Sequence, residues 1–126
     1  MSLNKLDVES ARIFLKMAAK EIKHKNYSLV KSKKVDGIRY RTSDLLLYLD
    51  ITNENDVWNY ILELTENDCV DVTMDHDKSR DTNTEVFEFK KEINGKLAYI
   101  KLTMRNKFIC LSFHEDNYAS LRGVKK

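Results

Sequence analysis

A phenol, an imidazole and an amine share one face of a hairpin expected near the C-terminus. The segment YIKLTMRNKFICLSFHE, residues 99–115, alternates apolar and polar residues on both sides of a short turn. Successive side chains of a strand point to opposite faces, so this alternation separates two faces. The polar face is expected to carry Tyr99, Lys101 and Thr103 from the first strand, and Cys110, Ser112 and His114 from the second.

Two turns set the pairing of this hairpin with the preceding strand, EVFEFKKEI at residues 85–93. Asn94-Gly95 is typical of a two-residue hairpin turn, because both turn positions require positive φ. A second two-residue turn is expected at Asn106-Lys107. Side chains paired across strands have Cβ atoms about 4.5–5.5 Å apart. Two polar rows across three strands follow from these turns: Lys90, Tyr99 and His114, then Glu88, Lys101 and Ser112.

The same register pairs apolar residues with apolar residues on the opposite face. A shift of one residue would turn every apolar side chain to the wrong side, so the pattern decides which face is buried. The face expected to meet the helices carries Phe87, Phe89, Ile100, Leu102, Met104, Ile109, Leu111 and Phe113.

The polar rows hold the side chains that metal-independent RNA cleavage needs. A base assists the 2′-hydroxyl, an acid protonates the leaving 5′-oxygen, and a cation stabilises the charged transition state. The predicted catalytic residues are Tyr99, His114 and Lys101, with His114 as acid or base because it titrates near neutral pH. The predicted substrate-binding residues are Lys78, Arg80, Glu88, Lys90 and Ser112. A solvated polar face without function is the alternative for the same residues.

No cofactor and no metal ion are expected. Asp75, Asp77, Ser79 and Asp81 have the spacing of a Ca²⁺-binding loop, but Arg80 stands where that loop needs glycine. His76 is expected in a solvated loop. His24 is expected at the C-terminal end of a lysine-rich helix, where a cation suits the helix dipole.

Length and charge indicate one domain with surfaces of opposite sign. The 126 residues are typical of a single domain, expected over 1–126. Residues 1–41 carry eleven basic and four acidic residues, a net charge of +7. Residues 42–89 carry two basic and thirteen acidic residues (net −11), and residues 90–126 carry nine basic and three acidic residues (net +6). Basic patches attract phosphates, so RNA is expected on the basic face.

Two further features predict a cytoplasmic protein without a membrane partner. No apolar stretch approaches the roughly 18 residues of a membrane-spanning helix. The two cysteines, Cys69 and Cys110, lack metal-ligand spacing and are expected to be reduced thiols.

Periodicity predicts an α+β fold, with N-terminal helices packed on one face of a C-terminal antiparallel β-meander. The helical part is expected over about 7–70, and its first helix from about Glu9 to Lys25 with Asp7 as N-cap. Within this part, a short strand or extended segment is expected from Tyr27 to Val35, followed by a turn at Asp36-Gly37. The segment DVTMDHDKSRDTNT, residues 71–84, is polar and is expected to be a loop. The meander is expected over about 85–115.

The motifs ILELTENDCV, NGK-x-x-YIKL and SFHE, in this order, resemble the MqsR family of toxins. The resemblance implies a RelE-like ribonuclease fold, cleavage of mRNA, and a cognate antitoxin protein as partner in a bacterial type II toxin–antitoxin system. It also implies that Tyr99 is the strand tyrosine of the active site and that His114 stands where some members carry lysine. The family's other basic residue would fall near Asp71, where no lysine stands, and Lys78 or Arg80 is expected to replace it.

Two other functions fit the same residues. One is a non-catalytic module that binds RNA or protein through the basic face, and the other is a toxin-like fold that has lost its activity. Asp71 favours these two, whereas the pairing of Tyr99 with His114 favours the ribonuclease.

Overall fold

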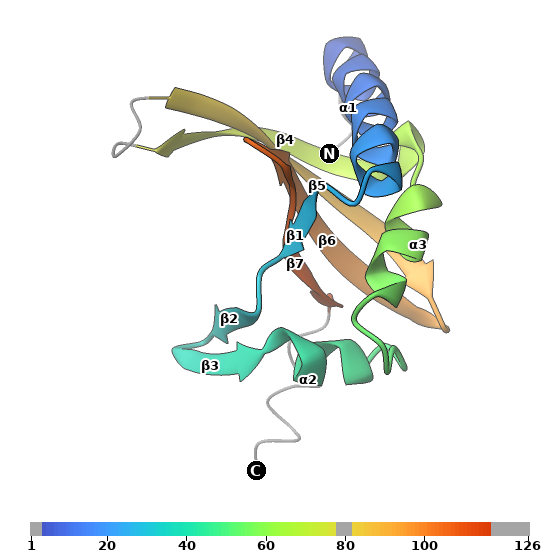
Figure 1. Cartoon of the computed structure of the whole chain (residues 1–126), viewed down its shortest axis with the longest axis vertical. Helices are drawn as coiled ribbons and strands as arrows, with labels where there is room; N and C mark the ends of the chain where they lie inside the picture. The colour runs from blue at the N-terminus through green and yellow to red at the C-terminus, as the bar shows by residue number, and fades with distance from the viewer. Residues whose placement is uncertain (1–3, 78–81, 117–126) are drawn as a thin grey trace.

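The chain folds as an α+β protein with a five-stranded sheet (Figure 1). The computed structural model describes residues 4–77 and 82–116. In chain order the elements are α1 (Lys5–Lys23), β1 (Tyr27–Leu29), β2 (Ser32–Val35), β3 (Ile38–Arg41), α2 (Thr42–Leu47), α3 (Asp56–Leu62), a short 3₁₀ turn (Glu66–Asp68), β4 (Cys69–Asp77), β5 (Thr82–Ile93), β6 (Lys96–Met104) and β7 (Phe108–Glu115). The part expected to be mainly helical also contains three short strands. Two of them, β1 and β2, lie in the segment Tyr27–Val35, where a short strand or extended segment was expected.

Helix α1 begins and ends earlier than the sequence pattern indicated. Asn4 caps it, because the Asn4 side-chain oxygen accepts a hydrogen bond from the Asp7 backbone nitrogen at 2.8 Å. Asp7, predicted as the cap, instead lies in the first turn, where a carboxylate suits the positive end of the helix dipole. Lys25 has a φ of 58°, outside the helical region, so the helix stops before it.

The sheet is mixed rather than wholly antiparallel. Its strand order is β1-β7-β6-β5-β4, with β1 parallel to β7 and the other neighbours antiparallel. The predicted meander of β5, β6 and β7 is confirmed, but the loop predicted over 71–84 is wrong, because its two ends belong to β4 and β5. The described side chains of β4 are mostly exposed, so backbone pairing with β5 holds this edge strand. Val70, Val72 and Met74 alternate with polar residues, a strand signal that the polar composition of the segment obscured.

The sequence predicted the β5–β6 turn correctly but the β6–β7 turn only in part. Asn94 and Gly95 have φ values of 52° and 81°, and the β5–β6 register is as predicted. The β6–β7 turn is one residue longer than expected, because Met104 pairs with Phe108. A β-bulge at Leu111 absorbs the difference.

Because of the bulge, the residues of β7 before Leu111 lie on the opposite faces from those predicted, whereas the two polar rows are paired as predicted. Cys110, predicted on the polar face, pairs with Leu102 and is fully buried in the apolar core. Ile109, predicted in the core, pairs with Thr103 on the polar face, and Leu111 is the unpaired bulge residue. Beyond the bulge, Tyr99 still pairs with His114 and Lys101 with Ser112.

Helices α1 and α3 cover one face of the sheet, here called the helix face, while α2 and hairpin β2–β3 lie at one end of it (Figure 1). The ring of Phe14 in α1 stacks on Phe87 of β5, with centroids 4.2 Å apart. Trp58 of α3 stacks on Tyr27 at 4.1 Å. Burying large aromatic side chains is a principal source of stability in such a layer.

Both cysteine thiols are free and buried. Burial raises the pKa of Cys69 to about 11 and that of Cys110 to about 12, so neither is a reactive thiolate at neutral pH. Within the described ranges, no helix has both the length and the apolar character to cross a membrane.

Candidate functional site

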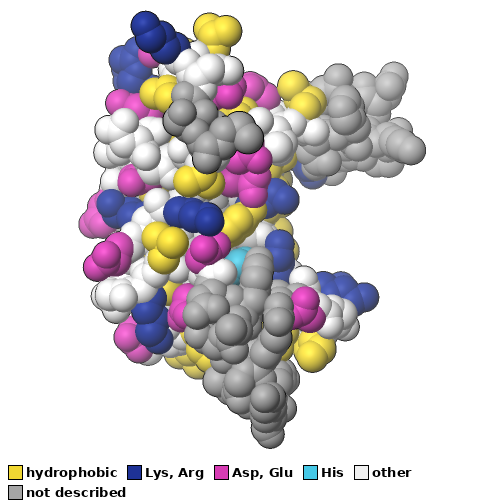
Figure 2. Space-filling view, turned by 180° about the vertical axis from the view of Figure 1, so that it is seen from behind, with side chains coloured by type: hydrophobic (Ala, Val, Ile, Leu, Met, Phe, Trp, Pro, Cys, Tyr) yellow, Lys and Arg dark blue, Asp and Glu magenta, His cyan; other side chains and the backbone are white. Residues whose placement is uncertain are grey.

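The predicted polar rows lie together on the sheet face opposite α1 and α3, here called the polar face. Lys90 pairs with Tyr99, and Tyr99 with His114. In the next row Glu88 pairs with Lys101, and Lys101 with Ser112. Figure 2 shows the molecule hollowed on the side away from α1 and α3, with Lys and Arg side chains along the hollow.

Tyr99 joins the two rows. Its ring stacks on the imidazole of His114, with centroids 5.3 Å apart and planes 5° from parallel. Its hydroxyl donates a hydrogen bond to the carboxylate of Glu88, diagonally across the β5–β6 ladder. Tyr99 and Glu88 are both half-buried, so a hydrogen-bonded phenol and carboxylate meet at the accessible surface of the sheet.

His114 is fully buried beneath this surface. Its Nδ1 lies 2.8 Å from the carbonyl oxygen of Glu115, and because a carbonyl oxygen only accepts, Nδ1 carries the proton. Burial lowers the pKa of His114 and the charge of Lys33 lowers it further, against the opposing effects of the Glu115 carbonyl and Asp116. The imidazole is therefore neutral at pH 7 and packs as a flat ring against Tyr99.

Lys33 is the site residue that the sequence did not reveal. It comes from β2, yet its Nζ donates a hydrogen bond to the Oγ of Ser112 on β7 at 2.8 Å. Burial lowers the pKa of Lys33, Lys101 lowers it further, and Glu88 raises it. One signal was available, because Asp36-Gly37 is a hairpin turn that pairs Lys33 with Tyr40, and Tyr40 is buried.

The remaining predicted residues take different positions. Lys90 forms an ion pair with Asp116 at 3.2 Å at the edge of the polar face. Lys101 is half-buried beside Glu88, and Ser112 is only 4% exposed. His24 lies at the C-terminal end of α1, as expected, and its backbone nitrogen caps the helix.

Several predicted residues fall where the structure makes no statement. Lys78, Ser79, Arg80 and Asp81 lie outside the described residues, as does the side chain of His76. The backbones of Asp75 and Asp77 belong to strand β4. Among the residues that the structure does describe, no three His, Cys, Asp or Glu side chains are grouped so that they could hold a metal ion.

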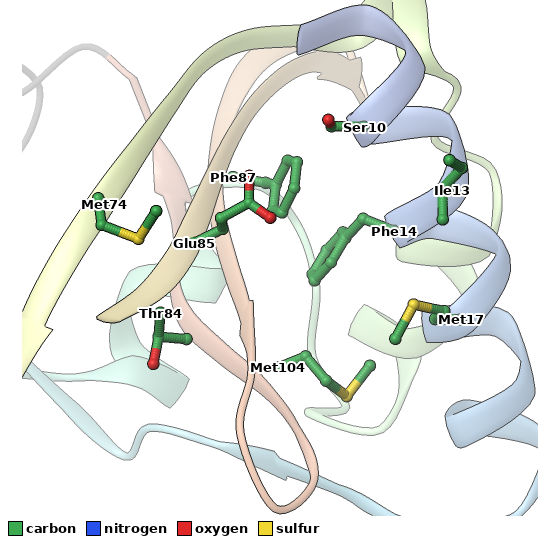
Figure 3. A pocket seen from close by; sticks show the side chains of 9 residues that line it. All are labelled: Ser10, Ile13, Phe14, Met17, Met74, Thr84, Glu85, Phe87 and Met104. Atoms are coloured by element: carbon green, nitrogen blue, oxygen red, sulfur yellow. The ribbon is translucent and has the colours of Figure 1, made fainter. Parts of the chain in front are cut away.

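A separate groove lies on the helix face, between α1 and the β4–β5–β6 part of the sheet (Figure 3). Its volume is about 490 Å³, and three of the chain's four methionines line it. Ile13, Met17 and Met74 at its rim are about half exposed. The lining residues are Ser10, Ile13, Phe14, Met17, Met74, Thr84, Glu85, Phe87 and Met104.

No protein-family model, no curated protein and no solved structure matches this chain. Its function is therefore inferred from the side chains of the polar face and from the motifs of its last hairpin.

Proposed function

We propose that the chain is a metal-independent endoribonuclease toxin of the RelE-like type, which cleaves mRNA and is neutralised by a cognate antitoxin in the bacterial cytoplasm. The observation that carries the proposal is the hydrogen bond from the Tyr99 hydroxyl to Glu88, with Lys101 paired beside Glu88. The resemblance of NGK-x-x-YIKL and SFHE to the MqsR family supports the same function.

The Glu88–Tyr99 pair supplies both proton transfers of the reaction. The Glu88 carboxylate takes the proton of the ribose 2′-hydroxyl, whose oxygen then forms a bond to the adjacent phosphorus. The bond from phosphorus to the 5′-oxygen breaks, and the Tyr99 hydroxyl protonates that oxygen. The products are a 2′,3′-cyclic phosphate and a 5′-hydroxyl, and the proton on Glu88 returns to the Tyr99 phenolate through their hydrogen bond.

Lys101 and His114 support these transfers in different ways. The ammonium of Lys101 stabilises the negative charge that grows on the phosphoryl oxygens as phosphorus becomes five-coordinate. His114 is too deeply buried to touch the RNA, so it acts as a positioning residue that holds the Tyr99 ring flat and its hydroxyl toward Glu88. This role replaces the acid or base role that its residue type suggested.

Cleavage of one purified RNA by wild type and Glu88→Gln tests the proposal. Glu88→Gln keeps the shape of the side chain but removes the base, and cleavage should fall by roughly 10²–10⁴-fold. Wild-type activity should persist in EDTA, and the products should end in a 2′,3′-cyclic phosphate. Full activity in a folded Glu88→Gln protein would remove Glu88 from the mechanism, and inhibition by EDTA would contradict a metal-independent reaction.

A second candidate function is a non-catalytic module that binds a protein partner. The groove between α1 and the sheet favours it, because methionine side chains adapt their shape to apolar partners. The same groove also offers the ribonuclease a place for its antitoxin, away from the polar face. If the protein binds a partner and leaves the RNA uncleaved in the assay above, the non-catalytic module is the correct function.

A further inference from the structure

Hairpin β2–β3 places one lysine over the polar face and keeps its neighbour in solvent. Lys33 pairs with Tyr40, and Lys34 pairs with Arg39. Tyr40 is buried and Lys33 half-buried, whereas Lys34 and Arg39 are exposed, so the first pair faces the molecule and the second faces solvent. Lys33 is held there by its hydrogen bond to Ser112.

This placement brings two ammonium groups together at an energetic cost. The charge of Lys101 disfavours the charged form of Lys33, and so does burial. Glu88 favours that charged form, but its carboxylate also accepts the hydrogen bond from Tyr99. An anion between the two ammonium groups would remove their repulsion and supply the hydrogen-bond acceptor that their donors need.

We propose that Lys33 and Lys101 together bind one phosphate group of the RNA, with Ser112 as the residue that positions Lys33. The phosphate as ligand rests on the proposed ribonuclease function. A serine hydroxyl that accepts from an ammonium holds that ammonium in one place, which is the role Ser112 has in the structure.

The position of this anion site fits the reaction. Lys101 lies in the same row as Glu88, and Tyr99 lies one row away on the same strand as Lys101, diagonally opposite Glu88. Diagonal neighbours on one face of a sheet are about 7–8 Å apart. A phosphate held by Lys33 and Lys101 therefore places its ribose within reach of Glu88 and Tyr99, and hairpin β2–β3 becomes part of the substrate site.

Binding of an RNA that cannot be cleaved separates this site from catalysis. The probe is a short single-stranded RNA with every 2′-hydroxyl methylated, and its affinity is measured by fluorescence anisotropy over a range of salt concentrations. Lys33→Met should weaken binding roughly tenfold, the usual worth of one charge-assisted hydrogen bond. It should also reduce the slope of log affinity against log salt by about 0.7, the value for one phosphate contact on a single strand.

Two matched variants control for charge and for folding. Lys34→Met removes a neighbouring exposed charge from the same strand and should leave the salt slope nearly unchanged. Lys33→Arg keeps the charge and should restore most of the affinity. The wild-type protein gives a measurement without any substitution, because probe binding should raise the pKa of the Lys33 ammonium followed by NMR.

The outcomes distinguish the anion site from the ribonuclease. An unchanged salt slope in a folded Lys33→Met protein, an equal loss in Lys34→Met, or an unmoved Lys33 pKa on probe binding would overturn the anion site. A wild-type protein that shows the Lys33-dependent slope but never cleaves unmodified RNA would sustain the anion site and overturn the ribonuclease.

Discussion

The two faces of the β5–β6–β7 sheet both contain fully buried side chains, but of opposite kinds. On the helix face, Phe89, Ile100 and Leu102 are buried among apolar neighbours. On the polar face, Thr103 and His114 are buried just as completely. Burying apolar surface stabilises a fold, whereas burying a polar group is unfavourable unless its hydrogen bonds are kept.

This difference shows which face stabilises the fold and which face contains polar groups that are costly to bury. The helix face contributes stability through Phe14, Trp58 and the strand residues beneath them. The polar face instead carries Lys33 and His114, whose pKa values are both lowered by burial. Residues that raise the free energy of the folded protein in this way are common at functional sites.

The largest effect is expected on the helix face. Phe89→Ala empties a fully buried position and should lower the free energy of unfolding by about 3–5 kcal/mol. Denaturant unfolding followed by circular dichroism measures it. Leu97→Ala on the neighbouring strand is the control, because Leu97 is 45% exposed and should matter little. Equal losses in the two variants would show that the helix face is not the main source of stability.

Tyr99→Phe should reduce activity far more than it reduces stability, in contrast to Phe89→Ala. It removes one hydroxyl from the polar face, so RNA cleavage should fall roughly 10²-fold or more. Stability should change by only about 1.5 kcal/mol, the low end for a hydrogen bond to a charged group, because Glu88 is only half-buried. Tyr60→Phe, which removes a hydroxyl from a ring packed near Phe113, should leave cleavage intact. A Tyr99→Phe protein that is unfolded rather than inactive would contradict the contrast between the two faces.

The pH dependence of stability should report the buried imidazole. Because the pKa of His114 in the folded protein lies below its ordinary 6.5, the unfolded chain binds more protons between the two values. Stability from the neutral ring is complete above about pH 6.5 and is lost as pH falls through the lowered pKa. The slope is at most about 1.4 kcal/mol per pH unit.

One substitution isolates this contribution. His114→Gln should flatten the pH profile of unfolding free energy below about pH 6.5. If His114→Gln and wild type have the same profile, His114 does not titrate differently in the folded and unfolded chains.

The smallest expected effect is electrostatic and lies wholly within the polar face. Lys101→Met removes a cation that lowers the pKa of Lys33, so that pKa should rise, as measured by NMR of the Lys33 ammonium. Glu88→Gln should move it in the opposite direction. Lys107→Met, in the exposed β6–β7 turn, should leave it unchanged. If the pKa of Lys33 is the same in wild type, Lys101→Met and Glu88→Gln, the charges of the polar face are not coupled.

Much of the polar face could be predicted because its pairing is local. Asn94-Gly95 fixes one register almost by itself, and the alternation on either side then places Lys90, Glu88 and Tyr99 correctly. The α+β class followed from the same periodicities.

The parts that could not be predicted depend on contacts between distant segments. Lys33 meets Ser112 across 79 residues of chain, and nothing in the spacing of KSKK indicates that contact. Strand β4 is a different case, because Val70, Val72 and Met74 alternate with polar residues and indicate a strand that the polar composition of residues 71–84 obscured. The burial of His114 depends on packing around the sheet, so its residue type alone suggested a proton-transfer role that its position does not favour.

The bulge at Leu111 bears on how this sheet can change length during evolution. Without Leu111, the strand would read FICSFHE, in which Phe108, Cys110 and Phe113 still face the helices. Loss of that one codon would therefore keep Ser112 under Lys33 and His114 under Tyr99. Loss of the next codon would give a strand of the same length, FICLFHE, with leucine in place of Ser112 beside the Lys33 ammonium. Of two single-residue deletions one position apart, only the first preserves the polar row.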